Sequence, residues 1–357
     1  MTDPVLEKIL DAYSFPEIDR RFAYSTDKFH ALRKIAEGHW RTLSQHASDG
    51  GVPAISERAC IYVTGSVARA EASADSDLDL FIMDEIEEGA ERLSYVENAH
   101  LVSTLDRIRI DADFQPFSGG GKWISTHSLQ QIVKETGSPE DDAKNTFTAR
   151  ILLLLNSKPI LNDRAYERAR TAVLDRYWQS ADRSKSRLPI MLINDIRRWW
   201  GVLGLNFEKY YTKAPIGNTG NYGTTPEREY ANLKLRYARL LACYSPILLL
   251  LHRSDDEGVK RDHAEEILSW TPIERLTALY DAVPTNIDIR TLIERVMRGY
   301  DDHLEFVSMG KSAILEALKE EKVRREKKDS AYGFHRDFVR LLNEVGDGKT
   351  LYDYVIV

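Results

Sequence analysis

The sequence has few cysteines and no long apolar run. Of its 357 residues only Cys60 and Cys243 are cysteines, too few for a disulfide framework or a cysteine-based zinc site. We therefore expect both to be small buried residues of a cytoplasmic protein. The strongest apolar runs, at 151–155 and 247–251, fall far short of the roughly 20 residues that a membrane helix needs. The sequence thus predicts no membrane association.

An excess of positive charge is also missing. The chain holds 49 basic and 56 acidic residues, which gives a formal net charge of −7. A general binder of duplex DNA carries a basic surface, so this function class is disfavoured. A chain that binds a triphosphate through metal ions needs carboxylates, and a mildly acidic balance agrees with that use.

The pattern of apolar residues divides the chain into two parts. Helical spacing through 29–43 predicts an N-terminal helix. Two β-rich runs, at 59–65 and 78–83, predict strands. From about residue 140 onward the periodicity is helical throughout. We therefore predict an α+β fold in which residues 1–140 form an N-terminal helix with a small α/β domain. Residues 141–357 would form an all-helical domain.

A further strand is predicted just before a glycine run. In "RIRIDADF" (107–114) apolar and charged residues alternate. By the two-residue period of a strand, the charged side chains share one face. This face would present Asp111 and Asp113 beside the two earlier strands.

The stretch "TGSVARAEASADSDLDLFI" (64–82) places two aspartates at the start of a strand. Asp77 and Asp79 are two residues apart, so their side chains share a face. Two such carboxylates repel each other unless a cation lies between them. Mg²⁺, with Mn²⁺ as an alternative, takes oxygen ligands and keeps bound phosphates and water. Upstream, Gly65 lets the backbone approach a phosphate, and the Ser66 hydroxyl can donate to its oxygens.

The same features also occur in ordinary structure. Asp-x-Asp alone is a common strand end, and Gly-Ser alone is a turn. Their combination, with a later strand that carries aspartates, favours a metal site that handles a nucleoside triphosphate over a surface turn followed by a strand.

The segment "GSVARAEASADSDLDLFI" resembles the signature of the polymerase-beta-type nucleotidyltransferase superfamily, which is Gly-Ser followed by Asp-x-Asp. The resemblance covers about residues 55–117. It implies a small mixed β-sheet with flanking helices, two Mg²⁺ ions, and transfer of a nucleotidyl group with release of pyrophosphate. By position, Gly65 and Ser66 match the turn that grips the triphosphate. Asp77 and Asp79 match the metal ligands and catalytic carboxylates.

The third carboxylate of such a site has two candidates. In "IDADFQPF", Asp113 is followed three residues on by Pro116, similar to the third-acid segment of the oligoadenylate-synthase-like branches. We assign Asp113 as the third catalytic residue and metal ligand, with Asp111 as the alternative. One metal would grip the triphosphate, and the other would activate the attacking hydroxyl.

The segment is also similar to the bacterial branch that holds the uridylyltransferases of the PII signal protein and their relatives of unknown function. Arg69 and Glu71 carry that likeness, and "TARILLLLNSKPILND" (148–163) resembles the helical part that follows the catalytic domain there. Ala70 departs from the pattern, because many relatives have glycine at this position. The His-Asp phosphohydrolase motif of the PII enzymes is absent from the sequence.

Two basic residues are candidates for contact with the triphosphate. Arg69 either reaches a phosphate or pairs with Glu71. Lys234 lies on a predicted helix of the second domain. In such enzymes a helical domain often closes over the triphosphate and supplies a lysine or arginine. Surface solvation or pairing within the helix is the alternative for Lys234.

These features predict an enzyme, a cytoplasmic Mg²⁺-dependent nucleotidyltransferase. It would move a nucleoside monophosphate, with ATP or UTP as donor, to a hydroxyl on a protein, RNA or small molecule. Two alternatives stay open. One is a degenerate member that binds nucleotide without transferring it and acts as a regulatory protein. The other is a toxin-like or antiphage enzyme that modifies RNA or protein.

Overall fold

The computed structural model describes most of the chain: residues 14–46, 59–85, 95–121, 124, 126–183, 188–211 and 225–356. The residues group into two compact units. One is Arg20–Ser180, which contains a four-stranded sheet and helices. The other joins Met1–Asp19 to Ala181–Val357, and its described elements are helices.

The unit Arg20–Ser180 contains all four strands. These are β1 (Ala59–Thr64), β2 (Asp79–Asp84), β3 (Thr126–Ser128) and β4 (Lys158–Leu161). Its helices, the first and last of which extend into the other unit, are α2 (Pro16–His46), α4 (Gly65–Ala68), α5 (Tyr95–Asp111), the 3₁₀ helix η1 (Ser118–Gly121), α6 (Leu129–Glu135), α7 (Glu140–Ala143), α8 (Thr146–Leu155) and α9 (Asp163–Arg183).

The four strands form one mixed sheet in the order β3-β2-β1-β4. β1 pairs antiparallel with β2 and β4, whereas β2 pairs parallel with β3. A small mixed sheet with helices is the α+β fold that we predicted. The strands predicted at 59–65 and 78–83 are confirmed as β1 and β2, and the N-terminal helix as part of α2.

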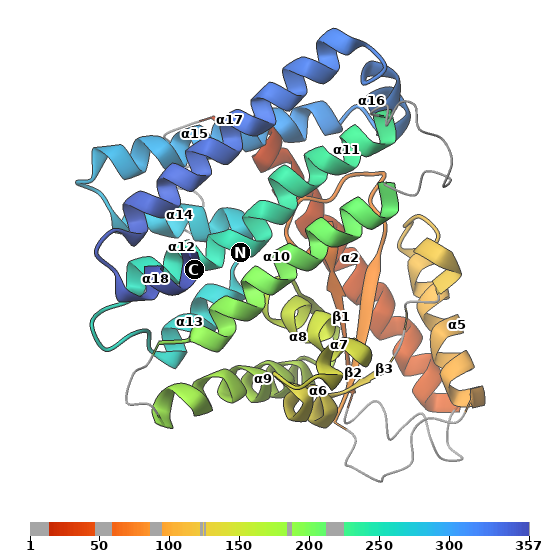
Figure 1. The fold of residues 1–357 in the computed structure, drawn as a ribbon. Helices are drawn as coiled ribbons and strands as arrows, with labels where there is room; N and C mark the ends of the chain where they lie inside the picture. The colour runs from red at the N-terminus through yellow and green to blue at the C-terminus, as the bar shows by residue number, and fades with distance from the viewer. Residues whose placement is uncertain are drawn as a thin grey trace, which may run out of the picture. The chain divides into compact units, whose positions relative to one another are not determined.

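The two faces of the sheet are covered differently. Alternate residues of β1 and β2, such as Ile61 and Ile82, join Leu32 of α2 and Leu105 of α5 in one apolar core. Figure 1 shows β1 and β2 running beside these helices. The opposite face carries Tyr62, which is fully buried. α2 and α5 therefore seal one face, and the residues that include Asp79 lie on the other.

Residues 107–114, predicted as a strand, belong to α5 and the turn after it. Leu101, Leu105 and Ile108 are buried in one core at spacings of four and three residues, which is the stripe of an amphipathic helix. Ile110 is 48% exposed. The strand prediction is therefore wrong, because the leucines upstream extend a helical period into a segment that alternates by itself.

The second unit consists of long packed helices. They are α10 (Ile190–Tyr211), α11 (Pro226–Lys234), the π-helix η2 (Leu235–Arg239), α12 (Leu240–Arg253), α13 (Arg261–Ser269), α14 (Pro272–Ala282), α15 (Ile287–Val307), α16 (Lys311–Ala317), α17 (Glu321–Gly346) and α18 (Thr350–Ile356). α15 and α17 run side by side (Figure 1). None of the described helices combines the length and apolarity needed to cross a bilayer.

The grouping into units differs from the division predicted near residue 140. Residues 141–180 group with the sheet, because β4 pairs with β1 at its edge. Cys60 and Cys243 are both buried, as predicted, and neither forms a disulfide.

Candidate functional site

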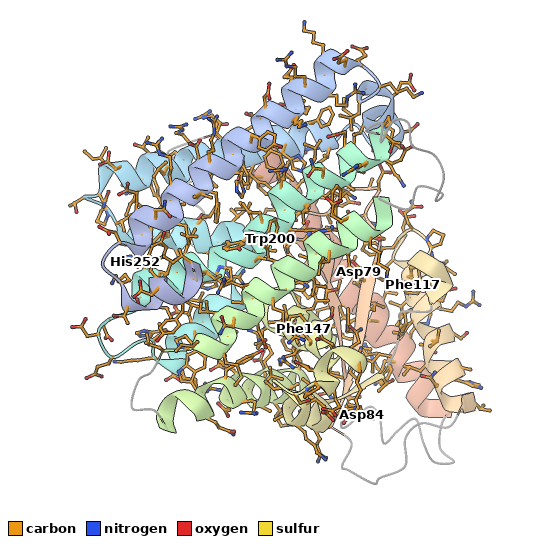
Figure 2. The ribbon with its side chains drawn as sticks, in the orientation of Figure 1. Asp79, Asp84, Phe117, Phe147, Trp200 and His252 are labelled. Carbon is orange, nitrogen blue, oxygen red and sulfur yellow. The ribbon has the colours of Figure 1, made fainter. Side chains whose placement is uncertain are left out.

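The Gly-Ser turn lies directly against the first residue of β2. Because β1 and β2 pair with Thr64 opposite Asp79, the residue after Thr64 falls beside the Asp79 side chain. Gly65 has a φ of +70°, and a Cβ on it would lie 2.5 Å from Oδ2 of Asp79. The left-handed backbone therefore favours glycine, and a side chain at position 65 would displace the Asp79 carboxylate. Figure 2 shows Asp79 at one end of β2 and Asp84 at the other.

The loop before β2 folds back on the same turn. Oγ of Ser66 donates to Oγ of Ser76 at 3.1 Å, and Oγ of Ser76 also accepts from the backbone N–H of Ser73 at 2.9 Å. Asp77 follows Ser76 directly, and Asp77 and Asp79 are both exposed. The structure therefore brings the Gly-Ser turn and both aspartates to one end of β2. Sequence reasoning missed Ser76, although its place next to Asp77 was a usable signal.

Arg69 pairs with a carboxylate of the chain itself. Nε of Arg69 donates to Oε2 of Glu71 at 2.8 Å, and the two side chains are 16% and 5% exposed. Ala70 between them has a φ of +59°, a backbone conformation that favours glycine. The glycine that the resemblance implies at position 70 thus has a physical reason. A contact of Arg69 with phosphate stays a prediction.

Asp113 lies on a turn rather than on a strand. α5 ends at Asp111, and Asp113 adopts a φ of +53°. Its side chain is fully exposed, with Oδ2 3.7 Å from Nζ of Lys28. The same Nζ donates to the carbonyl oxygens of Ala112 and Asp113 at 3.1 and 3.2 Å, so Lys28 caps the end of α5. The alternative candidate, Asp111, has Oδ2 2.6 Å from Nε2 of His39.

Asp113 and Asp75 both act on the same tyrosine. Burial is the main cause that raises the pKa of Tyr24, and the charges of Asp113 and Asp75 raise it further. Asp75 precedes Asp77 by two residues, in the loop before β2.

The donor set fits a magnesium ion in part. Asp77 and Asp79 supply exposed carboxylates, the ligands that Mg²⁺ prefers when phosphates and water complete its shell. Across the part of the chain that the structure describes, no three His, Cys, Asp or Glu side chains are arranged to hold a metal ion. The role of Asp113 as a third ligand therefore stays a prediction.

An aromatic ladder crosses the sheet on the face that carries Asp79. Phe81 shares that face by the two-residue period of β2. Its ring stacks on Tyr62 of β1 at 5.7 Å and on His127 of β3 at 5.6 Å between ring centroids. Tyr62 is buried against Tyr166 of α9, whereas Phe81 and His127 are only half-buried. The sheet face beside Asp79 is thus more open over β2 and β3 than over β1.

Lys234 belongs to the helical unit. It is the last residue of α11, and its Nζ lies 4.6 Å from the centroid of the Tyr230 ring one helical turn earlier. This cation–π contact is a structural use of the side chain. A contact of Lys234 with the triphosphate stays a prediction.

Comparison with protein-family models gave no match, and comparison with curated proteins gave none either.

Proposed function

We propose that the chain is a Mg²⁺-dependent nucleotidyltransferase that moves a nucleoside monophosphate from a nucleoside triphosphate to a hydroxyl acceptor, with release of pyrophosphate. The contact between Gly65 and Asp79 carries the proposal. A Cβ on Gly65 would lie 2.5 Å from the Asp79 carboxylate, so only glycine at position 65 leaves that carboxylate where it lies against the turn. A surface turn that merely precedes a strand has no need of this arrangement.

Each residue has a separate role in the proposed reaction. Asp77 and Asp79 would hold Mg²⁺, which would neutralise the triphosphate and lower the pKa of the acceptor hydroxyl. Ser66, held by its bond to Ser76, would donate to a phosphate oxygen. Arg69 would stay fixed by Glu71 and add positive charge beside the turn. Asp113, with Asp111 as the alternative, would supply the third carboxylate.

The donor and acceptor are proposed as classes. ATP and UTP are the expected donors, and the acceptor is a hydroxyl of a protein, an RNA or a small molecule in the cytoplasm. The test incubates the protein with each nucleoside triphosphate, labelled in its α-phosphate, and a fractionated cell extract. We expect label in one fraction with wild-type protein and none with Asp79→Asn.

Asp75→Asn is the matched control, because Asp75 is an exposed acid of the same loop and is outside the Asp-x-Asp pair. It should transfer label as the wild type does. Equal labelling by wild type and Asp79→Asn would exclude the proposed transferase.

A protein that binds nucleotide without transferring it is the second candidate. It is favoured by the lack of a third carboxylate beside Asp77 and Asp79 within the described residues. Release of pyrophosphate distinguishes the two candidates, because only the transferase releases it. Saturable binding of Mg·ATP with no release of pyrophosphate in the presence of extract would favour the binding protein.

A further inference from the structure

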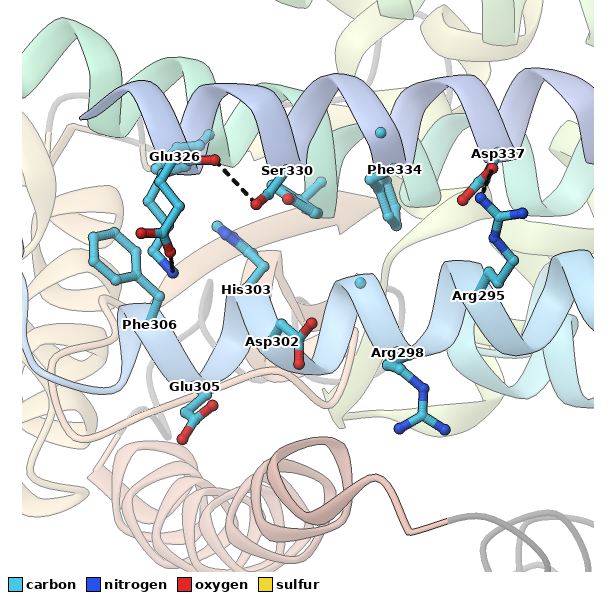
Figure 3. A pocket seen from close by; sticks show the side chains of 15 residues that line it. Arg295, Arg298, Asp302, His303, Glu305, Phe306, Glu326, Ser330, Phe334 and Asp337 are labelled. Carbon is cyan, nitrogen blue, oxygen red and sulfur yellow. Dashed lines mark hydrogen bonds and ion pairs between the residues drawn. The ribbon is translucent and has the colours of Figure 1, made fainter. Parts of the chain in front are cut away.

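A pocket of about 460 Å³ lies between α15 and α17 (Figure 3). This volume falls in the range of small-molecule sites, roughly 300–1,000 Å³. Its buried wall is aromatic: the rings of Tyr237 and His303 stack at 4.1 Å with an interplanar angle of 5°, and Phe334 lies 4.5 Å from Tyr237. The lining residues all belong to the helical unit.

Two glycines inside the helices make room for this pocket. Gly299 of α15 and Gly333 of α17 both line it, although glycine is an unfavourable residue in a helix interior. A Cβ on Gly299 would meet the Phe334 ring at 3.3 Å, whereas a Cβ on Gly333 would meet nothing within 4 Å. Gly299 therefore lets the aromatic wall approach α15. Gly333 leaves open space in the wall formed by α17.

A change of helix type places Tyr237 in the pocket. Leu235–Arg239 form a π-helix between α11 and α12, a feature that occurs frequently at functional sites. The Tyr237 side chain is 3% exposed, and no described residue accepts a hydrogen bond from its hydroxyl. Burial, and then the charge of Asp302, raises the pKa of Tyr237. The pocket is thus lined by a neutral hydroxyl that can donate to a ligand.

The carboxylates at the rim of the pocket outnumber the cations that are open to a ligand. Two of the three basic side chains of the rim pair with acids of the rim: Arg295 with Asp337 at 2.8 Å and Lys327 with Glu326 at 3.6 Å. The third, Arg298, lies 5.9 Å from the Phe15 ring. The side-chain carboxylates of Asp302 and Glu305 have no ion pair or hydrogen bond with any residue that the structure describes. Figure 3 shows both extending from the same side of α15. Their uncompensated charge favours a cationic ligand.

We propose that this pocket binds a small organic amine, with an ammonium group carried on a flat apolar body. The ammonium would pair with Asp302 and Glu305, and the apolar body would pack on the aromatic wall, where a cation within about 6 Å of a ring gains further attraction. The Tyr237 hydroxyl would donate to a polar atom of the ligand. This site goes beyond nucleotidyl transfer, because none of its residues belongs to the proposed transferase site.

The test titrates tyramine into the full chain and follows binding by calorimetry. The matched probe is 4-hydroxyphenylacetate, in which a carboxylate replaces the aminomethyl group of tyramine. We expect saturable binding of one tyramine and binding of the acid weaker by at least about tenfold. Asp302→Asn should weaken tyramine binding about tenfold. Glu344→Gln, which neutralises an exposed acid of α17 outside the pocket, should leave tyramine binding unchanged.

A second variant tests the location. Gly333→Leu fills the open space in the wall, and its folding is checked by its melting temperature. A folded Gly333→Leu that binds tyramine as the wild type does would overturn the proposal. Equal affinity for the two probes, no binding of tyramine, or unchanged binding by Asp302→Asn would also overturn it. Should Gly333→Leu not fold, the comparison of Asp302→Asn with Glu344→Gln decides.

Discussion

Gly65 is the single residue on which the geometry of the candidate transferase site depends most. Its φ of +70° disfavours a side chain, and a Cβ at this position would displace Oδ2 of Asp79. Ala70, five residues on, carries a side chain at a φ of +59°. A left-handed φ alone therefore does not require glycine, and the effect on Asp79 is what distinguishes Gly65.

Replacement of Gly65 by alanine should lower both stability and activity. We expect Gly65→Ala to lower the free energy of unfolding by about 1–3 kcal/mol, which is the cost of a left-handed non-glycine residue, and to displace Asp79. Urea unfolding and the transfer assay measure the two effects.

Gly38→Ala is the matched control, since Gly38 lies inside α2 with nothing within 4 Å of an added Cβ. It should stabilise the protein by about 0.5–1 kcal/mol and keep its activity. A Gly65→Ala protein as stable and as active as Gly38→Ala would contradict the close approach of Gly65 to Asp79.

The part of the site that could be predicted from sequence is its local part. Gly65 directly follows β1 and Asp79 begins β2, the next strand and the antiparallel partner of β1, so the order of the two motifs along the chain sufficed to place them together. Asp113 could not be placed in this way. Residues 107–114 fit a two-residue period, but burial of Leu101 and Leu105 in the core with Ile108 decides for a helix. Tertiary packing therefore decides between helix and strand for residues 107–114. The alternation of apolar and charged residues within the segment does not contain this information.

Among the elements, α8 is anchored by an ion pair without solvent contact. Arg150 of α8 and Asp141 of α7 are both 0% exposed, and two nitrogens of Arg150 donate to the two carboxylate oxygens at 2.8 and 2.7 Å. Nε of Arg150 also donates to the hydroxyl of Tyr177 in α9 at 2.7 Å. The pair ties three helices of the sheet unit together.

Breaking this buried pair should be costly. Asp141→Ala leaves the Arg150 charge buried without a partner, so we expect a loss of about 3–5 kcal/mol in the free energy of unfolding. Arg33→Ala breaks the pair of Arg33 with Asp163, which is 3.0 Å long but half-exposed, and should cost about 0–1 kcal/mol. Denaturant unfolding compares the two. Equal losses in the free energy of unfolding for the two variants would show that burial does not make the Arg150–Asp141 pair more important for stability.

At the start of α2, buried carboxylates make the free energy of unfolding depend on pH. The carboxylate of Asp301 in α15 accepts the backbone N–H groups of Glu17 and Ile18 at 3.0 and 2.8 Å. Burial, and then the charge of Asp301, raises the pKa of Asp19. The folded state therefore favours the protonated form of Asp19. This contribution to stability is full below the unfolded pKa of about 3.9 and is lost as pH rises through the folded value.

Replacing Asp19 by a neutral residue should remove the loss of stability that occurs as pH rises. We expect Asp19→Asn to have a higher free energy of unfolding than wild type at pH 7.5, and the difference to shrink as pH falls to 4. Urea unfolding at the two pH values measures it. A variant less stable than wild type at pH 7.5 would show that the charge of Asp19 is favourable in the folded state.

At the scale of the whole molecule, the grouping of residues into units could not be predicted from the sequence pattern alone. The helical character from residue 140 onward was predicted, yet residues 141–180 group with the sheet. The reason is β4, a four-residue strand (Lys158–Leu161) that pairs with β1 across about one hundred residues of sequence. A strand of this length has no distinct periodicity, so its pairing partner could not be predicted.

Net charge makes the binding of a triphosphate dependent on metal. A chain with a formal charge of −7 and two exposed aspartates at the candidate site repels a free nucleoside triphosphate. We expect ATP or UTP with Mg²⁺ to raise the melting temperature, since a ligand at 100 times its Kd stabilises by about 2.7 kcal/mol. Chelation of the metal, or Asp77→Asn, should abolish the shift. An equal shift without metal would place the triphosphate elsewhere.

The most direct measurement is single-turnover release of pyrophosphate from the preferred nucleoside triphosphate, with the acceptor fraction present. Wild type is compared with the double variant Asp77→Asn, Asp79→Asn and with the Asp75→Asn control. The account predicts that the double variant is slower by at least about a thousandfold, while Asp75→Asn keeps the wild-type rate. Pyrophosphate released at equal rates by wild type and double variant would contradict the assignment of these aspartates and, with it, the proposed function.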